Sequence, residues 1–152
     1  MFYGESAHSL DAKNRVFLPK RFQDELTRTH AGGLVAFLSR GQDACLYLFA
    51  EPGFQAALEE LKTRVFTGQD LRAAQRVFFA NSARVELDSS GRLLIPEKLR
   101  AGARLEKEIV MVGVGDRAEI WSKPAWEAYE AAHLSKLDHI DRVIAEETTG
   151  RN

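Results

Sequence analysis

The feature of this sequence that most constrains its fold is a segment that occurs twice. Residues 10–19 and 87–96 match at a fixed offset of 77 positions, with an Asp, an Arg and a Pro at equivalent places. Residues 48–54 and 120–126 match at an offset of 72, so the second copy is five residues shorter between the two blocks. Two ordered blocks of this kind indicate a duplication, and a duplicated sequence indicates a duplicated structural unit.

Both copies predict the same order of elements. Each has a strand, a tight turn, a second strand, a helix that begins at a proline, and then two further strands. In copy one we expect strands over 5–10, 15–18, 34–39 and 45–49, a turn over 11–14 and a helix over 19–28. In copy two we expect strands over 83–87, 92–95, 108–114 and 118–121, a turn over 88–91 and a short helix from Pro96.

The two predicted turns carry residues suited to a tight hairpin. Asn14 and Gly91 stand at the same place in the repeat, and both residue types tolerate the positive φ that such turns require. Asp11 and Asp88 open the turns, where an aspartate side chain accepts hydrogen bonds from nearby backbone N–H groups. The sequence therefore predicts Asp11 and Asp88 as the residues that order the turns.

Apolar residues at helical spacing lie between the copies and after them. Residues 52–64 and 70–80 predict two linking helices. A longer pattern from Pro124 to Ile144 predicts a C-terminal helix, which should fray over 148–152.

A single copy is not expected to fold alone, because its four strands would leave one face and two edges exposed. The simplest solution interleaves the two copies with pseudo-two-fold symmetry into a small barrel. The predicted fold class is therefore mainly β with peripheral helices (α+β), as one compact domain over 1–152. Within it we place repeat 1 at 5–52, linking helices at 53–80, repeat 2 at 81–124, and a C-terminal helix and tail at 125–152.

Composition limits the class of protein further. Hydrophobic residues make up 45% of the chain and charged residues 28%, as in soluble globular domains. No apolar run approaches the roughly 20 residues of a membrane helix, and no signal-peptide pattern opens the chain, so we expect a cytoplasmic protein. The single cysteine, Cys45, lies in an apolar run and should be buried. Trp121 and Trp126 follow the apolar patterns of their elements and should be largely buried.

The formal net charge of −1 hides an uneven distribution. Residues 13–22 hold four basic residues and no acidic one, whereas residues 127–152 hold six acidic residues and three basic ones. A local basic cluster permits DNA binding but does not require it, because solvated charged faces are common.

Both turns would present residues suited to DNA at an exposed hairpin tip. Cations, hydroxyls and amides contact phosphates, and an arginine can also reach a guanine edge in the major groove. The alternative is structural, because the Asp and the Arg of each turn can simply pair with each other. The predicted DNA-binding residues are those of the two tips and of the basic segment after the first tip: Lys13, Asn14, Arg15, Lys20, Arg21, Ser89, Ser90, Gly91 and Arg92.

Patterns typical of catalytic or metal sites are absent from the sequence. Ser6, His8 and Asp11 are close together, but the alternating faces of an extended strand do not favour a converging triad. His133 and His139 are six positions apart and would lie on different faces of a helix, unlike an i, i+4 metal-binding pair. We therefore expect no enzyme activity, no catalytic residue, no metal and no cofactor.

Several segments together resemble the MraZ family. They are the opening Met1 to Glu5, the block Leu10 to Arg15 with Pro19, the block Asp88 to Pro96, and Glu119 to Trp121. The resemblance covers nearly the whole chain. It departs at Asn14, where the family pattern and the second copy have glycine, and asparagine tolerates the same backbone.

The resemblance implies two tandem AbrB-like swapped-hairpin motifs in one pseudo-symmetric barrel, and a ring-shaped, octamer-like homo-oligomer. It implies that the paired Asp-x-x-x-Arg turns bind double-stranded promoter DNA. It also implies a nucleoid-associated regulator of the bacterial division and cell-wall gene cluster, which binds repeats upstream of its own gene.

Two other functions stay open on the sequence. An AbrB-type fold can be a protein-interaction module, as in antitoxins that neutralise a partner through an appended tail, and the acidic, amphipathic C-terminus would suit that role. A purely structural ring is the third alternative. Salt distinguishes DNA binding from the protein-interaction function, because DNA is released at high salt whereas a protein partner should stay bound.

Overall fold

The computed structural model describes residues 1–61 and 66–150. All eight strands expected from the sequence are present, and each of their ends lies within one residue of the expected position. The strands are β1 (Glu5–Ser9), β2 (Arg15–Phe17), β3 (Thr27–Arg28), β4 (Leu34–Arg40), β5 (Leu46–Phe49), β6 (Ala83–Glu86), β7 (Arg92–Leu94), β8 (Glu108–Gly113) and β9 (Ala118–Ser122). The helices are α1 (Lys20–Gln23), α2 (Glu51–Leu61), α3 (Gln69–Ala80), α4 (Glu97–Gly102), α5 (Lys123–His133), the 3-10 segment η1 (Leu134–His139) and α6 (Ile140–Gly150).

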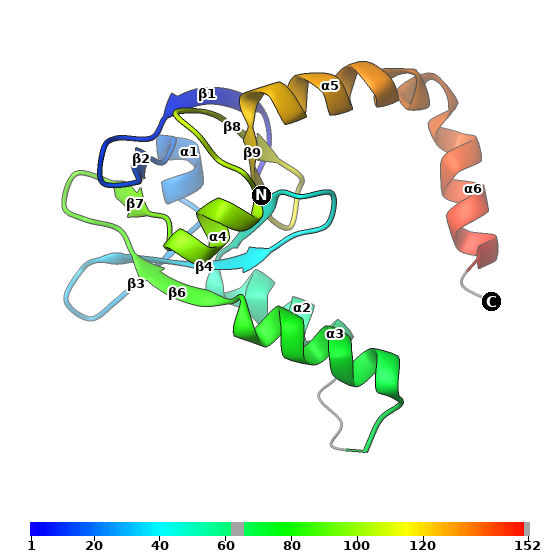
Figure 1. The fold of residues 1–152 in the computed structure, drawn as a ribbon, viewed down its shortest axis with the longest axis horizontal. Coiled ribbons are helices and arrows are strands. Elements are labelled where there is room, and N and C mark those ends of the chain that lie inside the picture. Colours follow the sequence, from blue (N-terminus) through cyan, green and yellow to red (C-terminus); the bar gives the residue numbers. More distant parts are fainter. Residues whose placement is uncertain (62–65, 151–152) are drawn as a thin grey trace. The chain divides into compact units, whose positions relative to one another are not determined.

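The strands of the two repeats are interleaved (Figure 1). In the larger sheet the order is β1-β8-β9-β5-β4, and both β3 and β6 pair with β4. A separate two-stranded sheet joins β2 to β7, and all of these pairs are antiparallel. Exchanging the repeats turns the pair β1·β8 into β6·β4 and the hairpin β4·β5 into β8·β9, as pseudo-two-fold symmetry requires.

The strand pairing makes this an α+β fold dominated by antiparallel sheet. Among the described residues, the pairing leaves the larger sheet open, so the closed barrel expected from the sequence is not established. The chain divides into two compact units, Met1–Ser122 and Lys123–Asn152, where the sequence predicted one domain. Strands β1 to β9 and helices α1 to α4 fall in the first unit.

One hydrophobic core joins the elements of the first unit. Leu38 of β4 packs in the same cluster as Val16 of β2 and Leu93 of β7, and each is at most 1% exposed. Phe22 of α1 and Leu99 of α4 complete it from the helical side. Burying one such side chain contributes about 1.5–3 kcal/mol, so these contacts help to hold the two short strands β2 and β7 in place.

The helix predicted over 19–28 is wrong in its second half. Helix α1 ends at Gln23, and Thr27–Arg28 form β3. Thr27 lies opposite Val35, and Arg28 lies opposite Leu34, so the backbone of this segment pairs with β4 instead of continuing the helix. A β-branched threonine suits a strand, and the available edge of β4 outweighs the local helical preference.

The two predicted linking helices are present as α2 and α3. The predicted end of the first one, at 62–64, lies outside the described residues. Cys45 is buried as expected, and burial raises the pKa of its thiol to about 12. Trp121 is also buried, at 3% exposed, which confirms that prediction.

The C-terminal unit differs from the single helix that the sequence predicted. A 3-10 segment, η1, separates α5 from α6, and α6 extends to Gly150 instead of fraying from Thr148. Trp126, expected to be largely buried, is partly buried, and its ring stacks on Tyr129 at 6.3 Å along the same helix. No helix within residues 1–61 and 66–150 has the length and apolar character to cross a membrane.

Candidate nucleic-acid interface

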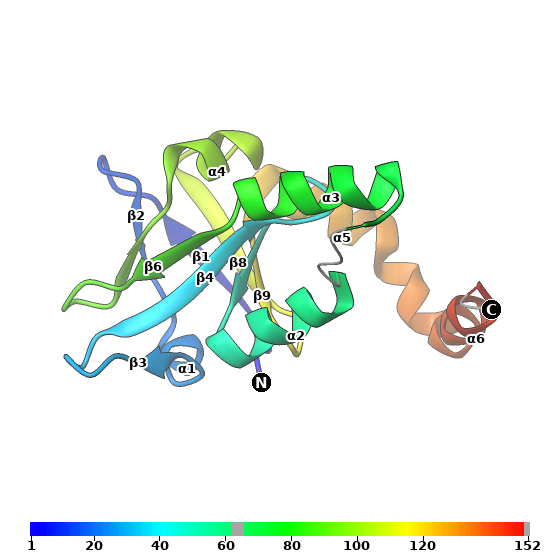
Figure 2. The ribbon, with the colours of Figure 1, turned by 90° about the horizontal axis from the view of Figure 1, so that it is seen from below.

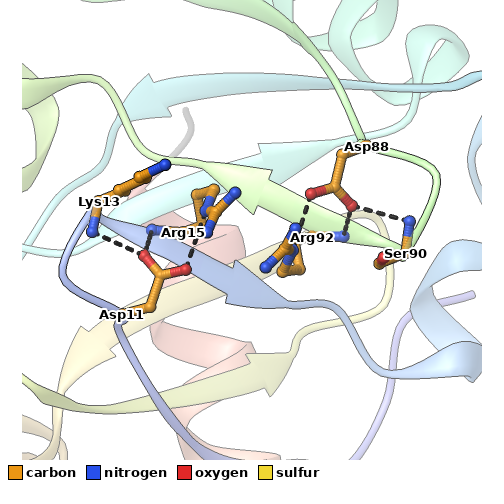
Figure 3. Close-up of polar contacts among 6 residues, drawn as sticks. All are labelled: Asp11, Lys13, Arg15, Asp88, Ser90 and Arg92. Atoms are coloured by element: carbon orange, nitrogen blue, oxygen red, sulfur yellow. Dashed lines mark hydrogen bonds and ion pairs between the residues drawn. The ribbon is translucent and has the colours of Figure 1, made fainter.

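The first turn, 11–15, is held together by the carboxylate of Asp11 (Figure 3). Its Oδ1 accepts hydrogen bonds from the backbone N–H groups of Lys13 and Arg15, each at 2.9 Å. Its Oδ2 accepts a third from Nε of Arg15, also at 2.9 Å. The backbone closes the same turn, because the N–H of Asn14 donates to the carbonyl of Asp11 at 3.0 Å.

The second turn, 88–92, repeats this arrangement atom for atom. Oδ1 of Asp88 accepts from the N–H groups of Ser90 and Arg92 at 2.9 Å, and Oδ2 accepts from Nε of Arg92 at 2.8 Å. The N–H of Gly91 donates to the carbonyl of Asp88 at 3.0 Å. Asp11 and Asp88 therefore order their turns as the sequence predicted.

Positive φ angles explain why Asn14 and Gly91 occupy the fourth position of the turns. Asn14 has φ of 60° and Gly91 has φ of 83°, a region that asparagine and glycine enter more readily than other residues. Gly91 is in addition buried, and a Cβ there would lie 2.6 Å from Nε2 of Gln23. Gly91 thus shapes the second tip, while Ser89 and Ser90 form its exposed part.

The two turns are joined through β2 and β7. Arg15 lies opposite Leu94, and Phe17 lies opposite Arg92, in one antiparallel ribbon. Beyond the ribbon, the N–H of Leu18 donates to the carbonyl of Gly91 at 3.1 Å, and the N–H of Ile95 donates to that of Asn14 at 3.0 Å. Figure 3 shows the turns at opposite ends of this ribbon with Arg15 and Arg92 between them, and Figure 2 shows both turns at one end of the first unit.

The electrostatics of the turns keep each arginine oriented. The N–H of Arg15 holds the pKa of the Asp11 carboxyl below its usual value, and the N–H of Arg92 does the same for Asp88. Each carboxylate is therefore ionised at neutral pH and fixes Nε of its arginine. Within residues 1–61 and 66–150, no hydrogen bond engages the terminal Nη atoms of either arginine, so these donors stay available to a ligand.

The other predicted cations have different surroundings. Lys13 is exposed at the tip, where its backbone, not its ammonium group, bonds Asp11. Lys20 forms an ion pair with Asp24 at 2.9 Å. Arg21 donates from Nε to the carbonyl of Tyr3 at 3.0 Å and lies over the ring of Phe22, so its contacts fix the N-terminal segment. The structure thus brings Lys13, Arg15 and Arg92 to the turns, whereas the polar contacts of Lys20 and Arg21 lie elsewhere.

Two cations that the sequence analysis did not single out lie beside the turns. Lys107 lines the same hollow as Asp11 and Asn14, and Arg28 lines one with Asp88 and Ser89. Lys107 is placed by the interleaving of the repeats, since its carbonyl accepts the N–H of Leu10 at 2.8 Å. No signal in the local sequence marks these neighbours, because strand pairing between the repeats creates them.

The serine, histidine and aspartate near the N-terminus do not form a triad. Ser6 and His8 do hydrogen-bond each other at 2.8 Å, but the Asp11 carboxylate accepts its hydrogen bonds from Lys13 and Arg15 of its own turn. Burial, and then the charge of Arg21, lower the pKa of His8. Within the described residues, no three histidine, cysteine or carboxylate side chains gather to hold a metal ion.

Comparison with known proteins follows the duplication. A family model described as "MraZ protein, putative antitoxin-like" matches residues 1–77 and again 78–146. Among curated proteins, the "Transcriptional regulator MraZ" of Pelotomaculum thermopropionicum is 41% identical over 150 residues, which is 99% of each chain. The protein of that name from Carboxydothermus hydrogenoformans is 46% identical over 129 residues, 85% of this chain and 86% of the relative. The one from Acetivibrio thermocellus is 43% identical over 145 residues, 95% and 97% of the two chains.

Proposed function

The chain belongs to the MraZ family, and we propose that it is a DNA-binding transcriptional regulator in which the two Asp-x-x-x-Arg turns contact double-stranded DNA. Two of the relatives compared above, both named as transcriptional regulators, are matched by this chain over nearly their full length. The target that the family resemblance suggests is a set of repeats upstream of the protein's own gene, in the cluster for division and cell-wall synthesis. Such a protein works on the chromosome, in the nucleoid.

The single observation that carries this proposal is the pair of oriented arginines on one ribbon. Arg15 and Arg92 are each held through Nε by an aspartate, and each side chain is still 28–29% exposed. A guanidinium fixed in this way has its two Nη groups free for a guanine edge or a phosphate. Because the side chain is already ordered, it loses little conformational freedom when it binds DNA. The local Asp–Arg pairing that the sequence left as a structural alternative is therefore compatible with DNA contact and supports it.

Around these arginines we propose a graded set of DNA-binding residues. Lys13, Asn14, Ser89 and Ser90 supply phosphate contacts at the two tips, and Gly91 lets the second tip turn. Lys20 and Arg21 lie further along the chain, and their ion pair and carbonyl contact assign them at most a supporting role. No cofactor, metal or catalytic residue is part of the proposal.

We further propose that the protein acts as a ring-shaped homo-oligomer of about eight subunits, in which repeats 5–52 and 81–124 form a pseudo-two-fold barrel in each subunit. Several turns on one ring would engage several DNA repeats, which raises the avidity for a repeated operator. Light scattering on the purified protein should give a single particle of several subunits. A monodisperse particle of 17.0 kDa would remove the ring from the proposal.

A mobility-shift titration tests the proposed DNA binding most directly. The probe is a duplex covering the region upstream of the protein's own gene, with a scrambled duplex of the same composition as competitor, over a series of salt concentrations. Specific binding should exceed binding to the scrambled duplex by about 1,000-fold or more, and both should weaken as salt rises. Equal affinity for the two duplexes would refute the proposed specificity.

The antitoxin-type function is the alternative, because the family description contains that word and the C-terminal unit exposes apolar side chains such as Leu137 and Ile144. Purification from the native host at high salt separates the two functions. A protein partner retained in stoichiometric amount after the DNA has been released would favour the antitoxin function.

A further inference from the structure

The outward face of the β2–β7 ribbon carries two large apolar side chains in addition to its arginines. Val16 and Leu93 point into the core, so the residues that alternate with them, at 15, 17, 92 and 94, share the outer face. Phe17 is 56% exposed and Leu94 is 52% exposed. They stand at the same place in the two repeats, 77 positions apart. The duplication has therefore put an exposed apolar residue twice on one short ribbon.

Each apolar residue lies across the ribbon from an arginine. Leu94 is opposite Arg15 and Phe17 is opposite Arg92, whose guanidinium carbon lies 5.8 Å from the centre of the Phe17 ring. Asp11 and Asp88 occupy only the Nε atoms, so the free Nη groups and the two apolar side chains are offered to a ligand from the same surface. The ligand that fits has acceptor atoms and apolar groups side by side.

The major groove of DNA has this combination. It is wide enough for a two-stranded ribbon, it presents the O6 and N7 acceptors of guanine, and its apolar groups are the C5 methyl groups of thymine. The arginine charge favours the anionic duplex over an apolar protein surface, where both guanidinium groups would lose water without compensation.

We propose that Phe17 and Leu94 are specificity-determining residues that contact thymine methyl groups in the major groove, beside the base pairs that Arg15 and Arg92 contact. This inference rests on the proposed DNA binding by the same turns. The arginines supply affinity and guanine recognition, and the apolar pair distinguishes a methylated from an unmethylated pyrimidine edge. Replacing Phe17 and Leu94 should therefore change the preference among sequences more than it changes binding to DNA in general.

Duplexes with and without thymine methyl groups test this directly. The probe is the duplex upstream of the protein's own gene, made once with thymine and once with deoxyuridine at every thymine position, so that only C5 methyl groups differ. Wild-type protein should bind the thymine duplex about fourfold more tightly for each methyl group contacted, the factor that burial of one such group supplies. In the Phe17→Ala/Leu94→Ala double variant, that ratio should fall close to one.

The matched control is Val114→Ala, which shortens an exposed apolar side chain, 42% exposed, away from the ribbon. It should keep the wild-type ratio of thymine to uracil affinity. Particle size and the thermal unfolding midpoint of the double variant are measured alongside, and both should match wild type because the two side chains lie outside the core.

Four results would overturn the inference. If wild type binds both duplexes equally, or if the double variant keeps the wild-type ratio, these residues do not contact thymine, while the proposed DNA binding stands. If the double variant changes particle size, the apolar pair lies between subunits and not against DNA. If wild type binds neither duplex, the proposed function fails together with the inference.

Discussion

The two Asp-x-x-x-Arg turns have the same backbone and different tips. Their carboxylate hydrogen bonds agree within 0.1 Å, and the side chains of their ion pairs are exposed to the same degree. The tips differ because Lys13 and Asn14 in the first turn correspond to Ser90 and Gly91 in the second. The two turns therefore share their Asp, their Arg and a residue that adopts positive φ, whereas the other residues between Asp and Arg set the charge that each turn presents.

Removing the arginine of the first turn should have the largest effect. Arg15→Ala deletes a contact worth about 1–3 kcal/mol at every engaged subunit, so it should abolish the mobility shift. The side chain is partly exposed and its ion pair contributes little to stability, so the unfolding midpoint and particle size should barely change. Lys136→Ala, on the exposed surface of η1, is the control and should bind like wild type. Wild-type affinity and salt dependence in the Arg15 variant would show that the first turn does not contact DNA.

Arg92→Ala should weaken binding through the same geometry but to a smaller extent. Its turn carries serines where the first turn carries Lys13, so the first turn supplies the stronger electrostatic attraction. We expect a shift that is still detectable, with an affinity lowered by about 10-fold or more, in line with one lost base contact. A titration of both variants side by side ranks the turns, and a greater loss for Arg92→Ala would reverse the ranking.

The position after each tip should distinguish the turns by stability. Gly91→Ala places a Cβ at positive φ and against Gln23, whose Nε2 already donates to the carbonyl of Leu18, so unfolding free energy should fall by about 1–3 kcal/mol. Asn14→Gly keeps the positive φ that the first turn needs, so it should change the free energy of unfolding by less than about 1 kcal/mol. Urea unfolding of the two variants provides the comparison. Equal losses would mean that a Cβ at position 91 costs no more than the loss of the Asn14 side chain, which contradicts the predicted difference.

The smallest predicted effect is on the stability of the protein at acidic pH. The backbone N–H groups of Arg15 and Arg92 lower the pKa of Asp11 and Asp88 in the folded protein, so both carboxylates contribute stability above their usual pKa. That contribution should disappear as pH falls through the lowered values, below about pH 4. Thermal unfolding between about pH 3 and 6 should therefore decline less steeply for the Asp11→Asn/Asp88→Asn variant than for wild type. An unchanged acid decline would mean that other carboxylates dominate it.

Local interactions explain why much of the site could be predicted. The turn residues interact within five positions of the chain, through Asx-type hydrogen bonds and positive φ angles, so the sequence was sufficient to place both Asp-x-x-x-Arg turns. The prediction of a helix over 19–28 was wrong in its second half because Thr27 pairs with Val35 of β4. A pattern of neighbouring residues contains no information about that pairing.

The sequence by itself determined the duplication, eight strands with their ends, and the two Asp-x-x-x-Arg turns, because these strands and turns follow from residues that are neighbours along the chain. The tertiary structure decided what lies between the repeats. The pairing of β1 with β8 brings Lys107 beside Asp11, and the pairing of β2 with β7 sets Phe17 opposite Arg92. Whether Val16 or Phe17 faces the core cannot be told from an apolar run. It is decided by which face of the ribbon meets the buried side chains of the other repeat, and that contact forms only when the chain is folded.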